Sequence, residues 1–567
     1  MFGKYRRMIG LVLVLTTVLG LLVGVARAQD EAVLVIGWEQ EPDVLGDGSS
    51  STFSQLLGDF YSRKAYGWNG AYQVYSDMMA EIPSIENGMV TTNEAGNTVV
   101  THKLKEGLLW SDGEAVTADD CLFGHKLFSD TSTGSIFRSD YPSVVESLEK
   151  VDDLTIVQTF NTVYPDFLGS DNITVMPQCR YPEHVLQPLM DANGGTIDGL
   201  SFFTTGEGWV GFGPYTLESW TKGDNITMVA NPNWTGQQPA FGRVILKFIL
   251  ESAQMQNALD TGEIDVAFNW QNDMLEGYQA IEGVEIWNTG SPYADALWFN
   301  IDEDGNNHPA LRDVNVRKAI IHAIDRANIT TAIAGEGVPV PGAFDSSVWW
   351  PEGLEILGYD VALANQLLDE AGWVDSNGDG LRDKDGLNLI LKFFTTPRQS
   401  RIDYQLAIQA NLQEVGIGTQ LFQVPGPAVL FASLTNLGIM ASSDYDLAIY
   451  ASSNDPVSPN VDPSSFSCAG IPSPENPASG NFSHYCDPAF DELIPQIAST
   501  LDPAARLALK HQSVELMNSA NFWAGLYVRV TWYAVRTDRV NTEGVKDGLG
   551  TLASNWFQQI EYWQPAG

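Results

Sequence analysis

The sequence predicts an α/β protein built from more than one packed domain. Strand-like runs alternate with amphipathic helical segments along the chain, a pattern typical of α/β architectures rather than of repeat proteins. A length of 567 residues exceeds what one hydrophobic core usually serves and predicts two or three domains. No proline-rich or serine-rich linker separates the parts. We therefore expect strands that cross between domains, an arrangement that suits a hinge.

The first half of the chain contains clear strand and helix signals. Residues 33–36 form an apolar opening strand, and residues 98–104 alternate apolar and polar side chains as a half-buried strand does. Thr117 precedes two aspartates in the stretch TADD, which predicts a capped helix beginning near Ala118. Residues 155–160 follow an acidic turn and form the next predicted strand.

The second half continues the alternation. Residues 213–215 lead into a predicted strand pair, residues 253–259 are helical, and residues 265–268 return as a strand. Residues 312–323 predict a strong amphipathic helix. Its apolar positions are Val316, Ala319, Ile320 and Ala323.

The first 28 residues predict a secretory signal peptide. A basic start precedes an apolar run over residues 8–25, and Ala26-Arg-Ala28 forms a small-x-small cleavage site. A membrane anchor is the alternative interpretation, although the run is short for a membrane span. No cysteine follows the cleavage site, so we expect no lipid anchor. The sequence therefore predicts a soluble protein of the periplasm or the extracellular space.

The composition argues against several classes of partner. The chain has 30 Lys and Arg residues against 71 Asp and Glu residues, a formal net charge of −41. Such a charge repels nucleic-acid backbones and anionic lipid surfaces, so we expect neither as a partner. A solvated acidic surface explains the charge, and adaptation to a saline habitat is a second explanation. No further segment reaches transmembrane length.

No motif in the chain indicates catalysis. The sequence contains no Gly-x-Ser-x-Gly nucleophile elbow, no His-Glu-x-x-His metal motif and no Walker loop. Carboxylates are so abundant that no catalytic pair can be singled out. A secreted hydrolase is the alternative from the enzyme class, but we expect no enzyme.

Four cysteines in an exported chain are expected to pair. Cys468 and Cys486 bracket a loop rich in Gly, Pro, Ser and Asn, where a crosslink removes roughly 3 kcal/mol of loop entropy from the unfolded state. We predict a disulfide between them. Cys121 and Cys179 remain as the second pair, with a buried free thiol at Cys121 as the alternative. No Cys or His spacing indicates a structural zinc site.

Short motifs follow one another in a fixed order across nearly the whole chain. They are LKEGLLWSDG (104–113), TADD (117–120), GFGPY (211–215), NPNW (231–234), GEID (262–265), DVNVRKAIIHAIDR (313–326), LLDEAGW (367–373) and the pair Ser467-Cys468 and Tyr485-Cys486. In this order the chain resembles the extracellular solute-binding proteins of family 5. These are the dipeptide- and oligopeptide-binding components of ABC importers.

The resemblance implies a type II periplasmic-binding-protein fold, the two-lobed Venus flytrap, with an extra subdomain inserted in the first lobe. The first lobe would comprise 29–62, 210–292 and 525–567, the insertion 63–209, and the second lobe 293–524. Ligand closure would bury a solute in the interlobe cleft, and ABC permease subunits in the membrane would recognise the closed form. We expect a monomer without a cofactor.

The solute class depends on one loop that departs from the peptide-binding pattern. Peptide-binding relatives carry an Asp that pairs with the peptide α-ammonium, and this chain has Ser452 or Ser453 at that place. A buried ammonium without a carboxylate costs several kcal/mol. Asp455 could substitute if the loop shifts, but Asp455-Pro456 also matches a structural turn. The alternative solute is therefore an oligosaccharide.

Aromatic rings and amides after predicted strands suit a polar, neutral ligand. Core packing is the competing interpretation for most of the tryptophans, Trp298 included. Arg401 lies near where dipeptide binders place an arginine for the ligand carboxylate, although a surface helix start also explains it. The candidate ligand-binding residues are Trp38, Glu39, Asn269, Trp270, Asn272, Arg401, Tyr450, Ser452, Ser453, Asn454 and Asp455.

One acidic loop has the spacing of an oxygen-ligand calcium site. Its candidate ligands are Asp375, Asn377, Asp379 and Asp383. The twelfth position is Gly386, however, rather than the Glu that completes an EF-hand. A hairpin turn is therefore the alternative.

Overall fold

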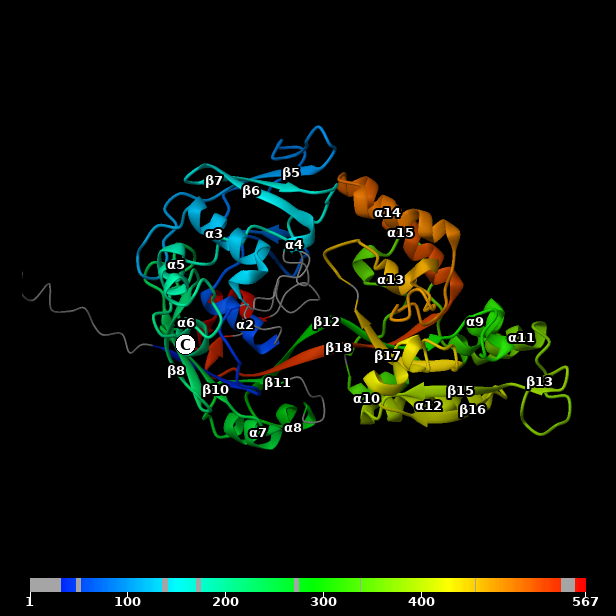
Figure 1. The fold of residues 1–567 in the computed structure, drawn as a ribbon. Helices are drawn as coiled ribbons and strands as arrows, with labels where there is room; N and C mark the ends of the chain where they lie inside the picture. The colour runs from blue at the N-terminus through cyan, green and yellow to red at the C-terminus, as the bar shows by residue number, and fades with distance from the viewer. Residues whose placement is uncertain are drawn as a thin grey trace, which may run out of the picture.

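The computed structural model describes residues 32–46, 52–134, 141–169, 175–269, 275–336, 338–453, 455–541 and 556–567. The predicted signal peptide, residues 1–28, lies outside these ranges. The described residues form two α/β lobes that lie next to each other and are joined by two long strands (Figure 1). The predicted two-lobed α/β fold is thereby confirmed.

A mixed sheet runs through both lobes. Among the described residues its strand order is β16-β15-β17-β12-β18-β11-β1-β10-β9-β8. In the first lobe β1 (Val33–Trp38) pairs in parallel with β10 (Arg243–Phe248) and β11 (Val266–Asn269). The antiparallel strands β9 (Asn225–Ala230) and β8 (Tyr215–Thr221) extend this end of the sheet. The helical segments of this lobe are α2 (Thr52–Tyr61), α7 (Ser252–Asp260), α8 (Leu275–Gln279) and η8 (Trp556–Tyr562).

The second lobe is built on three parallel strands, β15 (Ile390–Thr395), β16 (Gly418–Gln423) and β17 (Leu447–Ser453). One face packs against α9 (Val314–Ala323), α10 (Arg326–Ala334), α11 (Val361–Glu370) and α12 (Gln399–Glu414). The other face packs against α14 (Pro488–Ser499) and α15 (Pro503–Ala520), near the short helix α13 (Pro463–Phe466). A small hairpin of β13 (Asp383–Lys384) and β14 (Leu387–Asn388) projects from this lobe (Figure 1).

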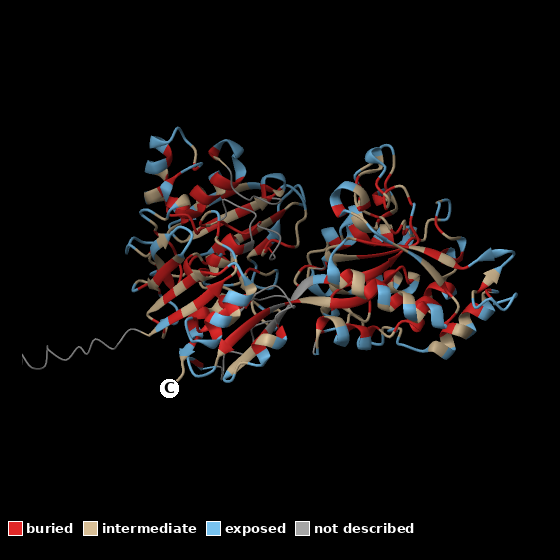
Figure 2. Ribbon diagram, turned by 90° about the horizontal axis from the view of Figure 1, so that it is seen from below, coloured by how far each residue is buried: buried red, intermediate tan, exposed pale blue. Residues whose placement is uncertain are grey.

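Two antiparallel strands cross between the lobes, as the lack of a linker predicts. They are β12 (Val284–Phe299) and β18 (Trp523–Arg536), whose register runs from Val284 opposite Arg536 to Trp298 opposite Trp523. Seen from below, this connection is narrow between the two bodies (Figure 2). A register shift between Gly290 and Ala294 interrupts the pairing where the chain leaves the first lobe. The predicted lobe boundaries, 292/293 and 524/525, fall within these two strands.

A second sheet with the strand order β4-β5-β7-β6 lies in the segment predicted as the insertion. Its strands are β4 (Val90–Thr92), β5 (Thr98–Lys103), β6 (Val145–Asp152) and β7 (Thr155–Phe160), and a hairpin of β2 (Gly67–Trp68) and β3 (Val74–Tyr75) precedes them. Its helices are α3 (Ala118–Ser129), α4 (Tyr141–Val144), α5 (Glu183–Ala192) and α6 (Ser201–Thr204).

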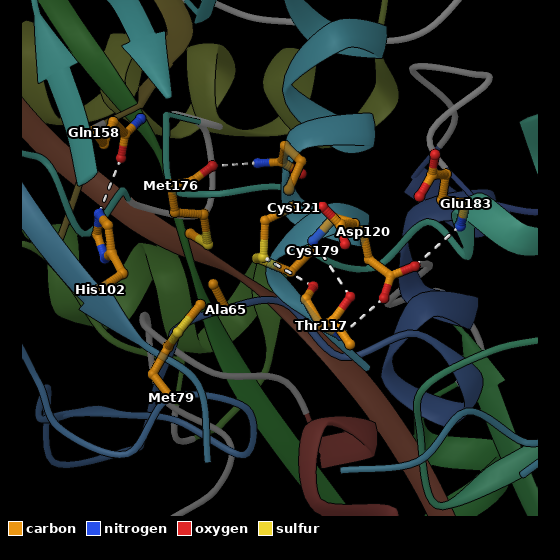
Figure 3. The surroundings of a disulfide bond; sticks show 12 residues. Ala65, Met79, His102, Thr117, Asp120, Cys121, Gln158, Met176, Cys179 and Glu183 are labelled. Carbon is orange, nitrogen blue, oxygen red and sulfur yellow. Dashed lines mark hydrogen bonds between the residues drawn. A yellow bond between two sulfur atoms is a disulfide. The ribbon is translucent and has the colours of Figure 1, made fainter. Parts of the chain in front are cut away.

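Helix α3 begins where its capping sequence predicts. The Thr117 side chain accepts a hydrogen bond at the helix start, and Asp120 reaches back to the Thr117 backbone N–H over 2.9 Å. Asp120 also accepts from the backbone N–H of Glu183, which ties α3 to α5 (Figure 3). Cys121 is disulfide-bonded to Cys179 in the same region, so the structure contains a disulfide rather than a free thiol here.

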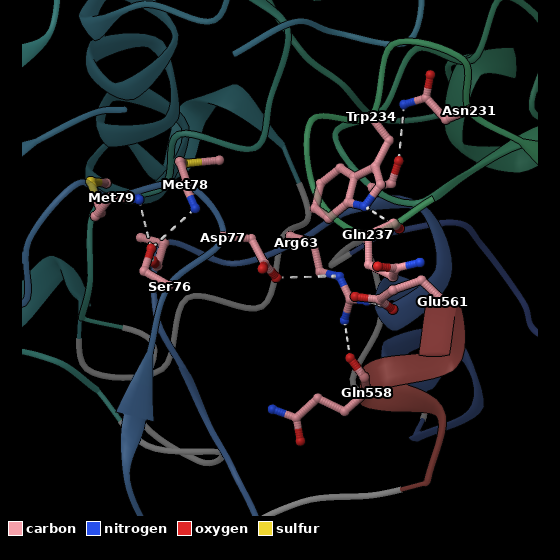
Figure 4. Close-up of polar contacts among 12 residues, drawn as sticks. Arg63, Ser76, Asp77, Met78, Met79, Asn231, Trp234, Gln237, Gln558 and Glu561 are labelled. Carbon is pink, nitrogen blue, oxygen red and sulfur yellow. Dashed lines mark hydrogen bonds and ion pairs between the residues drawn. The ribbon is translucent and has the colours of Figure 1, made fainter. Parts of the chain in front are cut away.

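Arg63 connects the start of the insertion with the end of the chain. Its buried guanidinium contacts the Glu561 carboxylate and the Gln558 carbonyl, and its Nε lies 3.7 Å from the Asp77 carboxylate (Figure 4). The terminal segment also pairs as β19 (Val540–Asn541) with β20 (Gln564–Pro565). The insertion is therefore fastened to the first lobe by residues nearly 500 positions apart in sequence.

The insertion also contacts the second lobe, through a buried ion pair. Arg506 of α15 donates from both terminal nitrogens to the Asp166 carboxylate over 2.7 Å each. Asn460 bonds to both partners. Asp166 adjoins Phe167, which packs in the hydrophobic core of the insertion.

The second predicted disulfide, Cys468 to Cys486, is also present. The helix predicted over 312–323 is split: a 3-10 turn (Pro309–Arg312) comes first, and α9 begins at Val314 because Asp313 caps it. No helix in the described part of the chain is long and apolar enough to cross a membrane.

Candidate functional site

The parallel strands of both lobes end beside the two crossing strands. Asn269, the last residue of β11, pairs with Trp532 of β18, and Ser453, the last residue of β17, pairs with Tyr293 of β12. In open α/β sheets, ligands bind beyond the carboxyl ends of parallel strands. The junction of the lobes is therefore the candidate binding site.

A buried carboxylate organises this junction. Asp295 of β12 is fully buried and accepts hydrogen bonds from the Nε atoms of Arg401, at 2.7 Å, and Arg529, at 2.8 Å. Burial alone would raise the pKa of Asp295, but the charges of Arg401 and Arg529 hold its pKa below the usual value. Asp295 therefore stays ionised, since two guanidinium groups compensate its charge.

The sheet positions this cluster against the start of α12. Leu297 packs in the hydrophobic core that includes residues of α12. Asp295 lies two residues before Leu297 on β12, and side chains two apart on a strand lie on the same face of the sheet. The Asp295 side chain therefore lies on the face that α12 covers. Arg401 lies in the first turns of α12 and is mostly buried. Its Nη1 also donates to Thr396, directly after β15, over 2.8 Å. Arg401, a predicted ligand-binding residue, thus reaches the junction but is bonded to Asp295 and Thr396.

An aromatic stack lies on the opposite face of the sheet. The ring of Tyr450 is stacked on Trp298 with 4.6 Å between centroids and an interplanar angle of 11°. Phe431 meets Tyr450 edge-on at 5.3 Å. Tyr450 is partly exposed, whereas Trp298 is buried in the core. The core interpretation therefore holds for Trp298, and Tyr450 stays a candidate for ligand contact.

Trp38 ends β1 inside the hydrophobic core of the first lobe. Its side chain has no exposed surface, and its ring lies 4.9 Å from Phe268 and 5.4 Å from Phe557. In this conformation Trp38 supports the strand end and offers no face to a solute. Glu39, the next residue, is partly exposed.

The strand β17 presents the two predicted serines near the junction. Ser452 is partly exposed and Ser453 is exposed. Asp455 accepts hydrogen bonds from the backbone N–H groups of Val457 and Ser458, at 2.9 and 3.2 Å, which is the geometry of a side-chain-stabilised turn. The structural interpretation of Asp455-Pro456 therefore matches its contacts.

Several predicted ligand residues cannot be placed. Trp270, Asn272 and Asn454 lie outside the described residues. Asn269 is described only as the last residue of β11. The best predicted amide cluster, 269–272, thus has only its strand end within the structure.

The acidic loop forms a turn closed by its own carboxylates. Asp375 accepts from the backbone N–H groups of residues 378, 379 and 380, and Asp379 accepts from the N–H of Leu381. Asp383 accepts from the backbone and hydroxyl of Ser376. Nowhere in the described ranges do three or more His, Cys, Asp or Glu side chains form a group that could hold a metal ion. These contacts match a hairpin turn.

Sequence reasoning missed Asp295, Tyr293 and Arg529 at the junction. One local signal was available for Arg529, because an arginine within the apolar run Leu526-Tyr-Val-Arg-Val530 needs a compensating partner. Its partner Asp295 is 234 positions away, which no local pattern reveals.

Comparison with known proteins agrees with this geometry. The fold is that of two-lobed solute-binding proteins. Residues 79–472 match the family described as bacterial extracellular solute-binding proteins, family 5 Middle. The chain belongs to this family.

Several named proteins are similar in sequence to most of this chain. Protein XP55 of Streptomyces lividans is 27% identical over 489 residues, covering 84% of this chain and 79% of the relative. The oligopeptide-binding protein AppA of Bacillus subtilis is 26% identical over 411 residues, covering 69% of each chain. Among solved structures, HbpA2 of Haemophilus parasuis has a TM-score of 0.73 at 17% identity and covers 93% of this chain and 98% of its own. The substrate-binding protein CtaP of Listeria monocytogenes has a TM-score of 0.72 at 20% identity, with 95% and 100% covered.

Proposed function

We propose that this chain is the solute-capturing subunit of an ABC importer and that its solute is a peptide. The chain would be exported by its signal peptide, bind the solute between its lobes and present it to membrane permease subunits. Binding rather than chemistry is then its activity. Among the relatives, the name of AppA includes oligopeptide binding, and other relatives of this chain are named as ABC transporter peptide-binding proteins.

The observation that carries the proposal is the convergence of both lobes' strand ends on one junction. Ser453 and Asn269 end parallel strands from different lobes, and both pair with the strands that connect the lobes. A solute seated there would touch both lobes at once. Its binding free energy would therefore favour a closed arrangement over an open one.

A neutral oligosaccharide is the second candidate, supported by the chemistry of β17. Ser452 and Ser453 place hydroxyl groups rather than a carboxylate at the end of this strand, and the ring of Tyr450 is partly exposed nearby. Hydroxyls and a ring face suit a sugar as well as a peptide backbone.

Thermal unfolding in the presence of solute panels tests the proposal. A bound solute raises the apparent stability by RT ln(1 + [L]/Kd), so a peptide panel should raise Tm while a neutral oligosaccharide panel does not. Mass spectrometry of the solute released from natively purified protein should identify peptides. A shift with sugars alone would replace peptide by oligosaccharide, and turnover of a panel member would contradict a purely binding role.

A further inference from the structure

Arg529 is held in a fixed orientation at the junction of the lobes. It lies on β18 at the register shift where the chain passes between the lobes. Its Nε donates to Asp295 over 2.8 Å, and its guanidinium carbon lies 5.9 Å from the ring centre of Tyr293. Asp295 is itself held by Arg401. The guanidinium is therefore fixed along one edge and close to an aromatic ring.

The two terminal amino groups of Arg529 have no hydrogen-bond partner among the described residues. The Arg529 side chain is 33% exposed and Tyr293 is 44% exposed, whereas the Arg401 side chain is only 10% exposed and already bonded. Arg529, rather than the Arg401 that the sequence indicates, is thus the arginine able to contact a solute.

The charge around Arg529 is positive although the chain as a whole is strongly acidic. Asp295 is in contact with two arginines, and Arg398, exposed at the start of α12, interacts electrostatically with the neighbouring Tyr527, as Asp295 and Arg529 do. Two guanidinium groups thus share the one carboxylate of Asp295, a local excess of positive charge in a chain of net charge −41. The local excess of positive charge favours an anionic group on the ligand.

We propose that Arg529 binds a carboxylate group of the solute through its two terminal amino groups, with the Tyr293 ring beside the contact. A guanidinium offers paired N–H donors that match the two oxygens of a carboxylate. Because Asp295 and Tyr293 already fix its orientation, binding requires little additional ordering of the side chain. The inference rests on the proposed function and adds an anionic anchor to it. On a peptide the carboxylate is the C-terminal group or an Asp or Glu side chain.

Calorimetric titration with matched probe pairs tests the assignment. The pairs are tripeptides with a free or amidated C-terminus, tripeptides containing Glu or Gln, and uronate-containing or neutral oligosaccharides. In the pair that binds, the carboxylate member should bind about tenfold to a hundredfold more tightly, the size of a charge-assisted hydrogen-bonded contact. R529Q should abolish this difference, and R529K should keep part of it because charge remains without the planar fork.

R312Q is the matched control, since Arg312 is exposed and its guanidinium donates to the Gly305 carbonyl rather than to a residue of the junction. It should leave every Kd unchanged, and thermal unfolding should show that all variants are folded. Peptides that bind equally as acid and amide, in wild type and R529Q alike, would overturn the assignment but leave peptide capture intact. Acidic sugars that bind in an Arg529-dependent way, without any peptide binding, would support the assignment and overturn peptide capture.

Discussion

His102 shows how burial at one residue makes stability depend on pH. The side chain is fully buried in the insertion, between the Tyr66 hydroxyl at 2.7 Å and the Gln158 amide oxygen at 3.1 Å. The Gln158 side-chain nitrogen donates to the Val175 carbonyl, so the Gln158 oxygen faces His102 and accepts a hydrogen bond from its Nε2–H. The imidazole is therefore neutral, and burial lowers the pKa of His102 to about 3.

The sign of the pH effect follows from this pKa. The unfolded chain binds a proton at His102 near pH 6.5, whereas the folded chain does so only near pH 3. Protonation thus favours unfolding between these values, and the stabilisation is complete only above pH 6.5. We expect His102 to cost about 2 kcal/mol of stability between pH 7 and pH 5. Urea unfolding at both pH values should show that wild type loses about 2 kcal/mol more than H102Q, because the other titrating groups are common to both proteins; equal losses would contradict it.

Asp295 is the residue whose charge holds the junction together. D295N removes the carboxylate and leaves Arg401 buried without a counter-ion, which typically costs about 3–5 kcal/mol. The control is D538N, because Asp538 pairs with Arg536 at the surface, where loss of a pair costs about 1 kcal/mol or less. Urea unfolding at pH 7 measures both. Similar losses of stability in the two variants would show that the buried Asp295 carboxylate contributes no more to stability than a surface ion pair does.

At the scale of elements, local chemistry made α3 predictable. We expect T117A to lose about 1 kcal/mol, because the side chain that accepts a hydrogen bond from the N–H of Asp119 disappears at the helix start. T117S keeps the hydroxyl and should remain close to wild type. Urea unfolding of both variants makes the comparison, and a T117A variant as stable as wild type would show that the capping box is dispensable.

Whether an element or a site residue could be predicted from the sequence depends on whether its contacts are local in the chain. The start of α3, β7 and the Cys468–Cys486 disulfide follow from patterns within short stretches, whereas Cys121 and Cys179 were the pair that remained. The junction does not, because its pairing is long-range: Arg401 meets Asp295 across 106 positions and Arg529 meets it across 234. Arg401 could be singled out for its position at a helix start, but its partner could not. Aromatic residues were a poor guide to ligand contact, since Trp38 is buried in the core, although core packing was the expected role of Trp298.

At the scale of the whole molecule, the described residues connect the two lobes in at least three places. The crossing strands form one connection, Leu275 of α8 packs in the hydrophobic core of the second lobe, and the Asp166–Arg506 pair joins the insertion to α15. Both side chains of this pair are at most 7% exposed, so neither charge is solvated by water. We expect the strands to permit a change in the angle between the lobes and the ion pair to oppose separation of the insertion from the second lobe.

We therefore predict that the ion pair favours the arrangement seen here over a more open one. R506Q leaves Asp166 without its bidentate partner and should open the unliganded protein, which small-angle X-ray scattering would record as a larger radius of gyration. D166N should act in the same direction. Because the two residues act through one contact, the double variant should lose less stability than the sum of the single losses, by about 0.5–3 kcal/mol in urea unfolding. Unchanged scattering together with additive losses would mean that this ion pair does not set the lobe arrangement.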